Sequence, residues 1–103
     1  MFNWFKNRRR RNILREPWPS TWNSILEGNV GLYKGLSTVD KTKLKAITRI
    51  IVSEKHWEAH GGLVMSDEIK VTIAGTAALL LLGVNDFYFD NVKTIIVFPI
   101  PIH

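Results

Sequence analysis

The stretch Ser-Asp-Glu-Ile-Lys-Val-Thr-Ile-Ala-Gly-Thr-Ala-Ala-Leu-Leu-Leu-Leu-Gly, residues 66–83, decides the fold, because it predicts a helix whose second half is apolar on every face. Ser66 can cap the first turn, and the acidic pair Asp67 and Glu68 opposes the positive end of the helix dipole. Gly83 supplies a left-handed stop. No charge occurs in residues 71–85, but this stretch is shorter than the roughly 18 to 20 apolar residues that cross a bilayer. We therefore expect a central helix of a soluble core, which needs cover on all sides.

The size of the chain makes that cover difficult to supply. A chain of 103 residues forms one domain at most, and such a domain buries only about 60 to 70% of the surface that its unfolded form exposes. Its 46% apolar and 22% charged residues are typical of globular proteins. The absence of cysteine excludes disulfides, thiolate nucleophiles and Cys-ligated zinc, and no secretory signal precedes the charged residues. We expect a cytoplasmic protein.

The positive charge is concentrated at the N-terminus. Six of the 14 basic residues lie in residues 1–15, which contain no acid, so the rest of the chain holds eight basic residues against nine acidic ones. We expect residues 1–16 to form a flexible basic tail and residues 17–103 to form the folded part. Trp4 and Phe5 beside the arginines leave open a contact with nucleic acid or an anionic membrane.

Three helices and one strand are predicted beyond this tail. The first helix starts after Pro19, with Ser20 as its cap, and the second starts at Ser37 and runs toward Gly61-Gly62. The apolar stripe of the second helix consists of Leu44, Ile47, Ile50, Ile51 and Trp57. The β-branched run from Lys93 to Phe98 predicts a strand, for which we find no second strand to pair with. The fold class is therefore α+β, with about three helices followed by one strand.

The sharpest cluster of chemically active side chains is His56, Glu58 and His60. Two histidines four residues apart share a helix face and could both reach a metal ion, as in the zinc peptidase motif His-Glu-x-x-His. In that motif the glutamate directly follows the first histidine, whereas Glu58 would project from a different face of the helix. The simpler interpretation is that both histidines interact with the negative end of the helix dipole.

No other pattern assembles a catalytic site. Asp67 and Glu68 are adjacent in a first turn and diverge, which favours dipole capping over acid and base catalysis. Asp86 and Asp90 flank an aromatic loop, where we expect them to be solvated. The aromatic residues are expected in packing rather than in a cofactor site; they are Trp22, Trp57, Phe87, Tyr88 and Phe89. The chain contains no phosphate-binding loop and no nucleophile elbow.

The order of several short motifs nevertheless resembles the N-terminal part of the Mlc titration factor A family, which consists of bacterial zinc-dependent peptidases. The motifs are Pro17-Trp18-Pro19, Lys55-His56-Trp57-Glu58, Gly61-Gly62-Leu63, Val71-Thr72-Ile73-Ala74, Ala78-Leu79-Leu80-Leu81-Leu82-Gly83 and Ile95 to Pro99. The resemblance implies a larger zincin-like peptidase fold, in which the sequence 17–103 is an incomplete N-terminal portion. It also implies zinc, bound by a His-Glu-x-x-His region that follows the strand and is not found in this chain, so no catalytic or metal-binding residue is assigned here.

The leading hypothesis is an N-terminal segment of a zinc-dependent, aminopeptidase-like metallopeptidase, truncated or split and inactive alone. The alternative is a non-catalytic interaction module that binds a transcriptional repressor or another protein, with the basic tail contacting nucleic acid or membrane. The partners implied by the resemblance are a peptide substrate, that repressor and the missing C-terminal part of the domain. Open strand edges and the uncovered helix also predict self-association. An independent small enzyme is not supported, because no nucleophile, base and orienting group come together.

Overall fold

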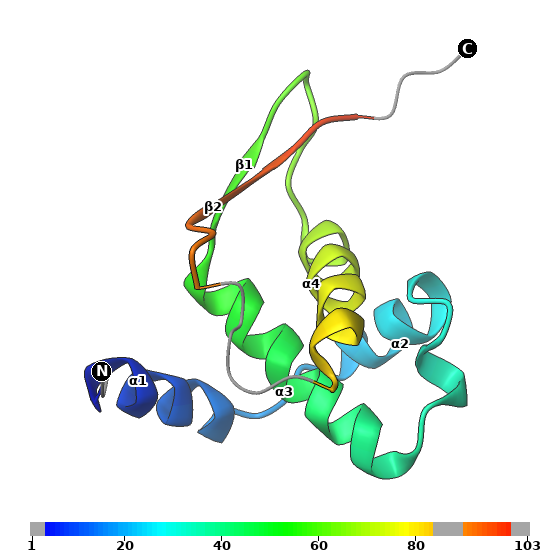
Figure 1. The fold of residues 1–103 in the computed structure, drawn as a ribbon. Coiled ribbons are helices and arrows are strands. Elements are labelled where there is room, and N and C mark those ends of the chain that lie inside the picture. Colours follow the sequence, from blue (N-terminus) through cyan, green and yellow to red (C-terminus); the bar gives the residue numbers. More distant parts are fainter. Residues whose placement is uncertain (1–3, 84–89, 100–103) are drawn as a thin grey trace.

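The computed structural model describes residues 4–83 and 90–99, which form a mainly helical α+β fold (Figure 1). The elements in chain order are α1 (Trp4–Arg15), α2 (Ser20–Asn29), the 3₁₀ helix η1 (Tyr33–Gly35), α3 (Thr38–Glu54), β1 (His56–Ala59), α4 (Asp67–Leu81) and β2 (Thr94–Val97). The α+β class is confirmed. None of the helices within these two ranges combines the length and the hydropathy that a membrane span requires.

Two of the predicted helix starts are confirmed by their caps. The hydroxyl of Ser37 accepts a hydrogen bond from the Asp40 backbone N–H at 3.1 Å, and α3 begins at the next residue. The hydroxyl of Ser66 accepts one from the Ile69 N–H at 3.3 Å at the start of α4. A capping hydroxyl satisfies one of the backbone donors that a helix start leaves without a partner. Both helices are therefore fixed locally at their N-termini.

Two other predicted helix ends are wrong. Ser20 is the first residue of α2 rather than its cap. The cap position is Pro19, whose side chain has no atom that can accept a hydrogen bond. Gly83 is not a left-handed stop, because Gly61 and Gly62 are the glycines with positive φ within the described residues. The last turn of α4 instead tightens, since the Leu82 N–H donates to the Leu79 carbonyl at 3.5 Å.

The largest correction concerns residues 56–60, which we expected in the last turns of the second helix. Helix α3 ends at Glu54, and His56–Ala59 form β1, which pairs in parallel with β2. The backbone N–H of His60 donates to the Val97 carbonyl at 2.9 Å. Pairing with a strand far along the chain overrides the local helical pattern. The prediction that the strand at residues 93–98 lacks a partner is therefore wrong, although that strand itself is confirmed at Thr94–Val97.

The two glycines after β1 make a turn that few other residues could form. Gly61 and Gly62 have φ values of 66° and 81°, a left-handed conformation that strains residues with a Cβ atom. A Cβ atom on Gly61 would also lie 2.9 Å from Cδ of Pro99. Gly61 and Gly62 were expected to end a helix. They instead form the turn that follows strand β1.

The basic N-terminal residues also differ from the expected flexible tail of residues 1–16. Trp4–Arg15 form α1, which lies along α3, and Arg10 is only 7% exposed (Figure 1). A buried arginine requires anionic partners, because an unpaired charge is costly to remove from water. The partners of Arg10 lie far along the sequence and are described below. The boundary between a tail and a domain at residue 17 stays a prediction.

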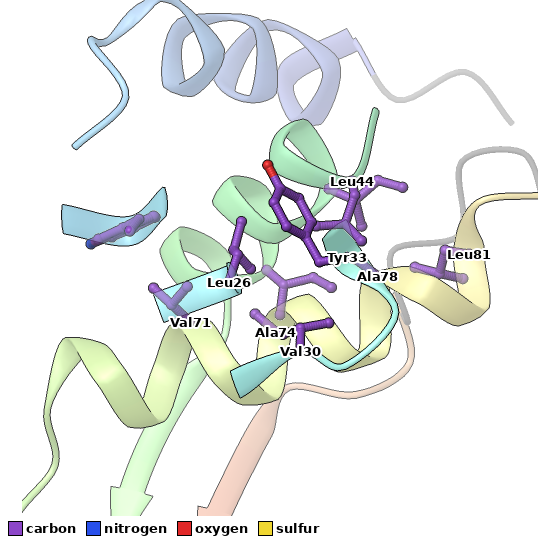
Figure 2. Packing of buried hydrophobic residues seen from close by; sticks show 11 residues of the cluster. Leu26, Val30, Tyr33, Leu44, Val71, Ala74, Ala78 and Leu81 are labelled. Atoms are coloured by element: carbon purple, nitrogen blue, oxygen red, sulfur yellow. The ribbon is translucent and has the colours of Figure 1, made fainter. Parts of the chain in front are cut away.

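The core is formed where α2 and α3 both pack on α4 (Figure 2). Buried side chains come from all three helices, from η1 and from Val30, which lies between α2 and η1. They are Trp22, Leu26, Val30, Tyr33, Leu44, Ile47, Ile51, Val71, Ala74, Ala78 and Leu81. The predicted stripe of the second helix is thus confirmed for its residues within α3. The face of α4 that carries Leu80 stays open, because this side chain is 73% exposed. The described residues cover α4 on one side and not on all sides.

Helix α2 and the following Val30 pack closely on α4 at Gly75. A Cβ atom at this position would lie 2.7 Å from Cδ2 of Leu26 and 3.1 Å from Cγ2 of Val30, two fully buried side chains. Overpacking of a core costs about 1 to 3 kcal/mol, while alanine gains about 1 kcal/mol over glycine in a helix. Gly75→Ala should therefore lower the free energy of unfolding by about 1 kcal/mol, as measured by urea denaturation.

Gly28 provides a matched control in α2, because a Cβ atom there has no neighbour within 4 Å. Gly28→Ala should leave the stability unchanged or raise it, since only the helix propensity changes. Equal effects of the two substitutions would contradict the close packing of α2 on α4.

Candidate functional site

The outer face of the two-stranded sheet carries the histidine cluster that the sequence singled out. His56 and Glu58 are two residues apart on β1, so they point to the same side, and His60 follows in the same row. Nε2 of His56 lies 3.4 Å from Oε1 of Glu58, and Nε2 of His60 lies 3.4 Å from Oε2. The expectation that Glu58 projects away from the histidines is wrong, because the period of a strand is two residues.

This cluster does not form a zinc site. Each imidazole contacts a different oxygen of the one carboxylate, and the Cα atoms of residues four apart in a strand are separated by about 13 Å. Within residues 4–83 and 90–99, no group of three His, Cys, Asp or Glu side chains could hold a metal ion. The row on β1 is instead an exposed, partly charged surface, bordered by the ring of Phe98 at 5.3 Å from that of His60.

The other candidate residues have structural roles or lie outside the described residues. Asp67 and Glu68 begin α4, and Glu68 accepts a hydrogen bond from the amide of Asn29 at 3.1 Å, which ties α4 to α2. Trp22 is buried in the core, and Trp57 donates to the Val52 carbonyl at 3.2 Å. Four expected loop residues fall outside the described ranges: Asp86, Phe87, Tyr88 and Phe89.

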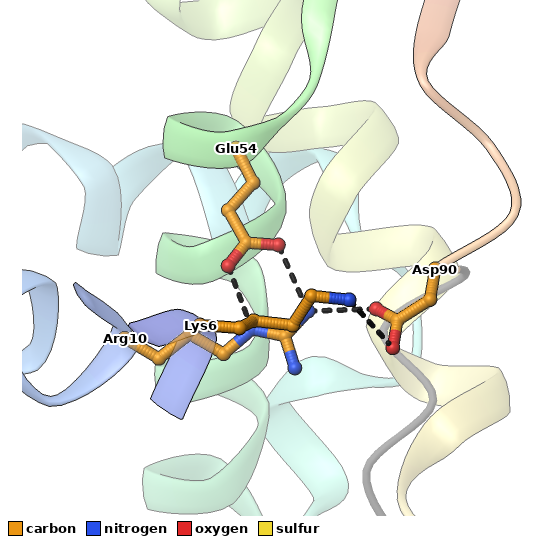
Figure 3. A network of polar contacts seen from close by, with 4 residues as sticks. All are labelled: Lys6, Arg10, Glu54 and Asp90. Carbon is orange, nitrogen blue, oxygen red and sulfur yellow. Dashed lines mark hydrogen bonds and ion pairs between the residues drawn. The ribbon is translucent and has the colours of Figure 1, made fainter. Parts of the chain in front are cut away.

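An ion network joins three distant parts of the chain through Arg10 (Figure 3). The Arg10 guanidinium donates from Nε to Oε2 of Glu54 at 2.6 Å and from Nη2 to Oε1 at 2.9 Å. Nη2 also donates to Oδ1 of Asp90 at 2.7 Å, and Nζ of Lys6 lies 3.4 Å from Oδ2 of the same carboxylate. The sequence had suggested that Asp90 is simply solvated. In the structure it is paired with Arg10 and Lys6.

The network changes the protonation equilibria of its members. Burial by itself would raise the pKa of Asp90, but hydrogen bonds and charge from Arg10 and Lys6 outweigh it, so this pKa lies below its ordinary value. Burial would lower the pKa of Arg10, and Glu54 and Asp90 reverse that effect and raise it. Both shifts favour the charged forms, which makes the network a fixed ionic contact at neutral pH.

Removing the Arg10 guanidinium should destabilise the fold, because the Glu54 carboxylate would lose its cation in a largely water-excluded position. In Arg10→Met, the largely buried Glu54 side chain, which is 10% exposed, loses its cation. We expect the free energy of unfolding to fall by about 3 kcal/mol. The double variant Arg10→Met/Glu54→Leu should recover most of this loss, because an apolar pair replaces a buried ion pair at little cost. Urea denaturation of the three proteins measures both effects. Failure of the double variant to recover stability would contradict the role of Glu54 as the main partner.

The lowered pKa of Asp90 predicts a specific acid dependence. A carboxyl whose pKa is lower in the folded state adds stability above its unfolded pKa of about 3.9, and this stability is lost as the pH falls through the folded value. Asp90→Asn should therefore be less stable than the unmodified chain near pH 7, and the difference should shrink below about pH 4. Urea midpoints from neutral to acidic pH test this; a constant difference would contradict it.

A second surface feature is an apolar hollow on the open face of α4. We call it the α4 hollow; it has a volume of about 620 Å³ and is lined by Leu32, Thr72, Ile73, Thr76, Ala77, Leu79 and Leu80. Leu32 and Leu80 are 71% and 73% exposed. Large exposed apolar surfaces of this kind mark sites of protein contact. The uninterrupted Ala-Ala-Leu-Leu-Leu-Leu run of residues 77–82 was the signal in the sequence.

These features define a helical framework with an open apolar face, and the described residues contain no metal-binding group. Comparison with protein families matches residues 4–103 to the glucose-regulated metallo-peptidase M90 family. The chain belongs to this family, which confirms the resemblance stated from the sequence.

Among curated proteins, the chain is similar to the uncharacterized protein slr2042 of the cyanobacterium Synechocystis sp. (strain ATCC 27184 / PCC 6803 / Kazusa). The two are 28% identical over 91 residues, which cover 88% of this chain and 33% of the relative. The chain thus spans about a third of the length of the curated relative it matches. No solved structure matches the chain.

Proposed function

We propose that this chain forms the N-terminal portion of a cytoplasmic zinc-dependent peptidase of the M90 family and has no peptidase activity by itself. The observation that carries the proposal is the family match over residues 4–103, in a chain that covers only 33% of the relative. Its sequence contains no His-Glu-x-x-His. The role of this portion is to provide the framework on which a zinc-binding portion is placed.

The α4 hollow supports this role. The second half of α4 is apolar on all faces, but the face that carries Leu80 is exposed. This face requires a further partner, because exposed apolar surface is unfavourable in water. The sheet points to the same conclusion, since β1 and β2 pair only with each other within the described residues. Their outer edges can accept further strands. We propose that the remaining part of the peptidase domain occupies both surfaces.

Zinc and its ligands belong to that remaining part in this proposal. The row of His56, Glu58 and His60 does not fit a zinc ion, because its side chains pair with one another along a strand instead of converging. When bound, zinc in a peptidase polarises the substrate carbonyl and activates water. This chain would contribute position and packing to such a centre, and a peptide would be the substrate.

A second candidate function is a protein-interaction module without catalysis. The same α4 hollow favours it, because an apolar surface with a polar surround can bind a transcriptional repressor or a second copy of this chain. A contact of nucleic acid or membrane with the basic N-terminus receives less support, since α1 directs Arg10 into the protein. The two candidate functions differ in one expected result. Only the peptidase portion should gain zinc-dependent hydrolysis of a peptide substrate when it is combined with a zinc-binding segment.

The leading proposal is tested by reconstitution. The purified chain with zinc should bind no stoichiometric metal and hydrolyse no aminopeptidase substrate. We expect chelator-sensitive hydrolysis to increase at least about tenfold when the chain is mixed with an M90 segment that contains His-Glu-x-x-His, because docking on the hollow completes the domain. Leu80→Glu should abolish this increase, since it places a charge in the docking surface.

Val39→Glu is the matched control, because Val39 is also largely exposed but lies at the start of α3 and does not line the hollow. It should reconstitute like the unmodified chain. Metal-dependent hydrolysis by the isolated chain would overturn the proposal. Binding of the M90 segment without any gain in hydrolysis would favour the interaction module.

A further inference from the structure

A pocket of about 320 Å³ lies between the end of α1 and one face of α3. One side comes from the last turn of α1 and the segment that leads to α2, and the other side comes from α3. The lining residues include Leu14, Glu16, Trp18, Lys45, Ala46 and Arg49. Lys45 and Arg49 are four positions apart in α3, so they share a helix face. The proposed function uses the α4 hollow and the sheet edges, and it assigns no role to this pocket.

Arg49 is the buried charge among these lining residues. The residue is 8% exposed and its side chain is 10% exposed. Its guanidinium lies 6.0 Å from the ring centroid of Trp22, and Nη2 lies 3.7 Å from Oε1 of Glu16, which is too long for a hydrogen bond. Among the residues that the structure describes, we find no hydrogen-bond acceptor for this guanidinium. Because a buried cation without acceptors is costly, the pocket that it lines is suited to an anion.

Glu16 supplies only part of the negative charge that Arg49 requires. Its side chain is 69% exposed, and an exposed carboxylate in a long ion pair contributes little. The charged lining residues are Lys45 and Arg49 against Glu16, so positive charge is in excess by one. A carboxylate from a ligand can accept two parallel N–H groups of a guanidinium, which Glu16 does not do.

The rest of the lining is mainly apolar and held in place. Leu14 and Ala46 contribute aliphatic surface, and Trp18 contributes an indole ring. The Trp18 ring packs edge-on against Trp22, with 5.2 Å between the ring centroids, and its Nε1 donates to Oδ1 of Asn23 at 2.9 Å. A wall that is fixed before binding lowers the cost of ordering on binding. A planar apolar group can therefore pack on this ring.

We propose that this pocket binds a small carboxylate with a planar apolar body: the carboxylate pairs with Arg49, and the body packs on Trp18. Small-molecule sites occupy about 300 to 1,000 Å³ and combine an apolar lining with a few polar groups. A pocket of about 320 Å³ is at the lower end of this range, which suits a single ring with a short chain. Free aromatic acids and the C-terminal aromatic residue of a peptide share this chemistry.

The test is isothermal titration calorimetry of the 103-residue chain with phenylpropionate, at constant ionic strength set with chloride. We expect saturable binding of one molecule per chain, with a Kd of about 1 mM or tighter for a ligand of this size. Phenylpropionamide has the same body without the charge, and acetate has the charge without the body. Each should bind at least about tenfold more weakly.

Two substitutions in the pocket should change the affinity in opposite directions. Arg49→Gln should weaken binding of phenylpropionate about tenfold or more, because it removes the charge-assisted contacts. Glu16→Gln should strengthen binding about threefold, because it removes a competing carboxylate. Glu16 is exposed, and a gain in affinity cannot result from a failure to fold. Circular dichroism checks the fold of both variants.

Glu27→Gln is the matched control. It makes the same chemical change at an exposed glutamate of α2, and Glu27 does not line the pocket. It should bind phenylpropionate like the unmodified chain.

A parallel titration with N-acetylphenylalanine identifies the source of the ligand, because this compound carries a peptide-like carboxylate beside the same ring. Tighter binding than phenylpropionate assigns the pocket to peptide C-termini, and weaker binding assigns it to free aromatic acids. Either result supports the proposal.

Absence of saturable binding of phenylpropionate would overturn the proposal, and so would equal affinity for its amide. An equal gain of affinity in Glu16→Gln and Glu27→Gln would also overturn it, because binding would then follow net charge alone. The experiment needs neither zinc nor an M90 segment. Its failure is therefore distinguishable from a failure of the proposed peptidase role.

Discussion

The parallel pairing of β1 with β2 determines the arrangement of the chain. Two parallel strands cannot be joined by a tight turn, so the chain has to cross from the end of one strand to the beginning of the other. Residues 60–93 make this connection, and α4 is the helix within it. The same helix provides the surface on which α2 and α3 pack. Sheet and core therefore depend on one element.

The parts of this fold that the sequence predicted are those decided by neighbouring residues. Ser37 and Ser66 mark helix starts because a hydroxyl three residues before a free backbone N–H is enough to cap it. The stripe from Leu44 to Ile51 and the β-branched run at Thr94–Val97 are likewise local patterns.

The parts that the sequence did not reveal depend on contacts between distant residues. Strand β1 has four residues, and its partner begins more than thirty positions later, so no local pattern distinguishes it from the end of a helix. The basic N-terminus was expected to be flexible because it is a terminal block of like charges. The carboxylates that pair with Arg10 are 44 and 80 positions away, so no local pattern indicates them. The role of Glu58 was likewise misjudged, since the direction of its side chain depends on the strand conformation.

The run of four consecutive arginines at residues 8–11 is consequently not a uniform motif. At position 10 the guanidinium bridges two carboxylates in a fixed planar arrangement, which the single ammonium of lysine cannot reproduce. Position 11 is exposed, so lysine can replace its arginine without removing a buried contact. Substitution of arginine by lysine is thus a conservative change at one position of the run and a structural change at its neighbour.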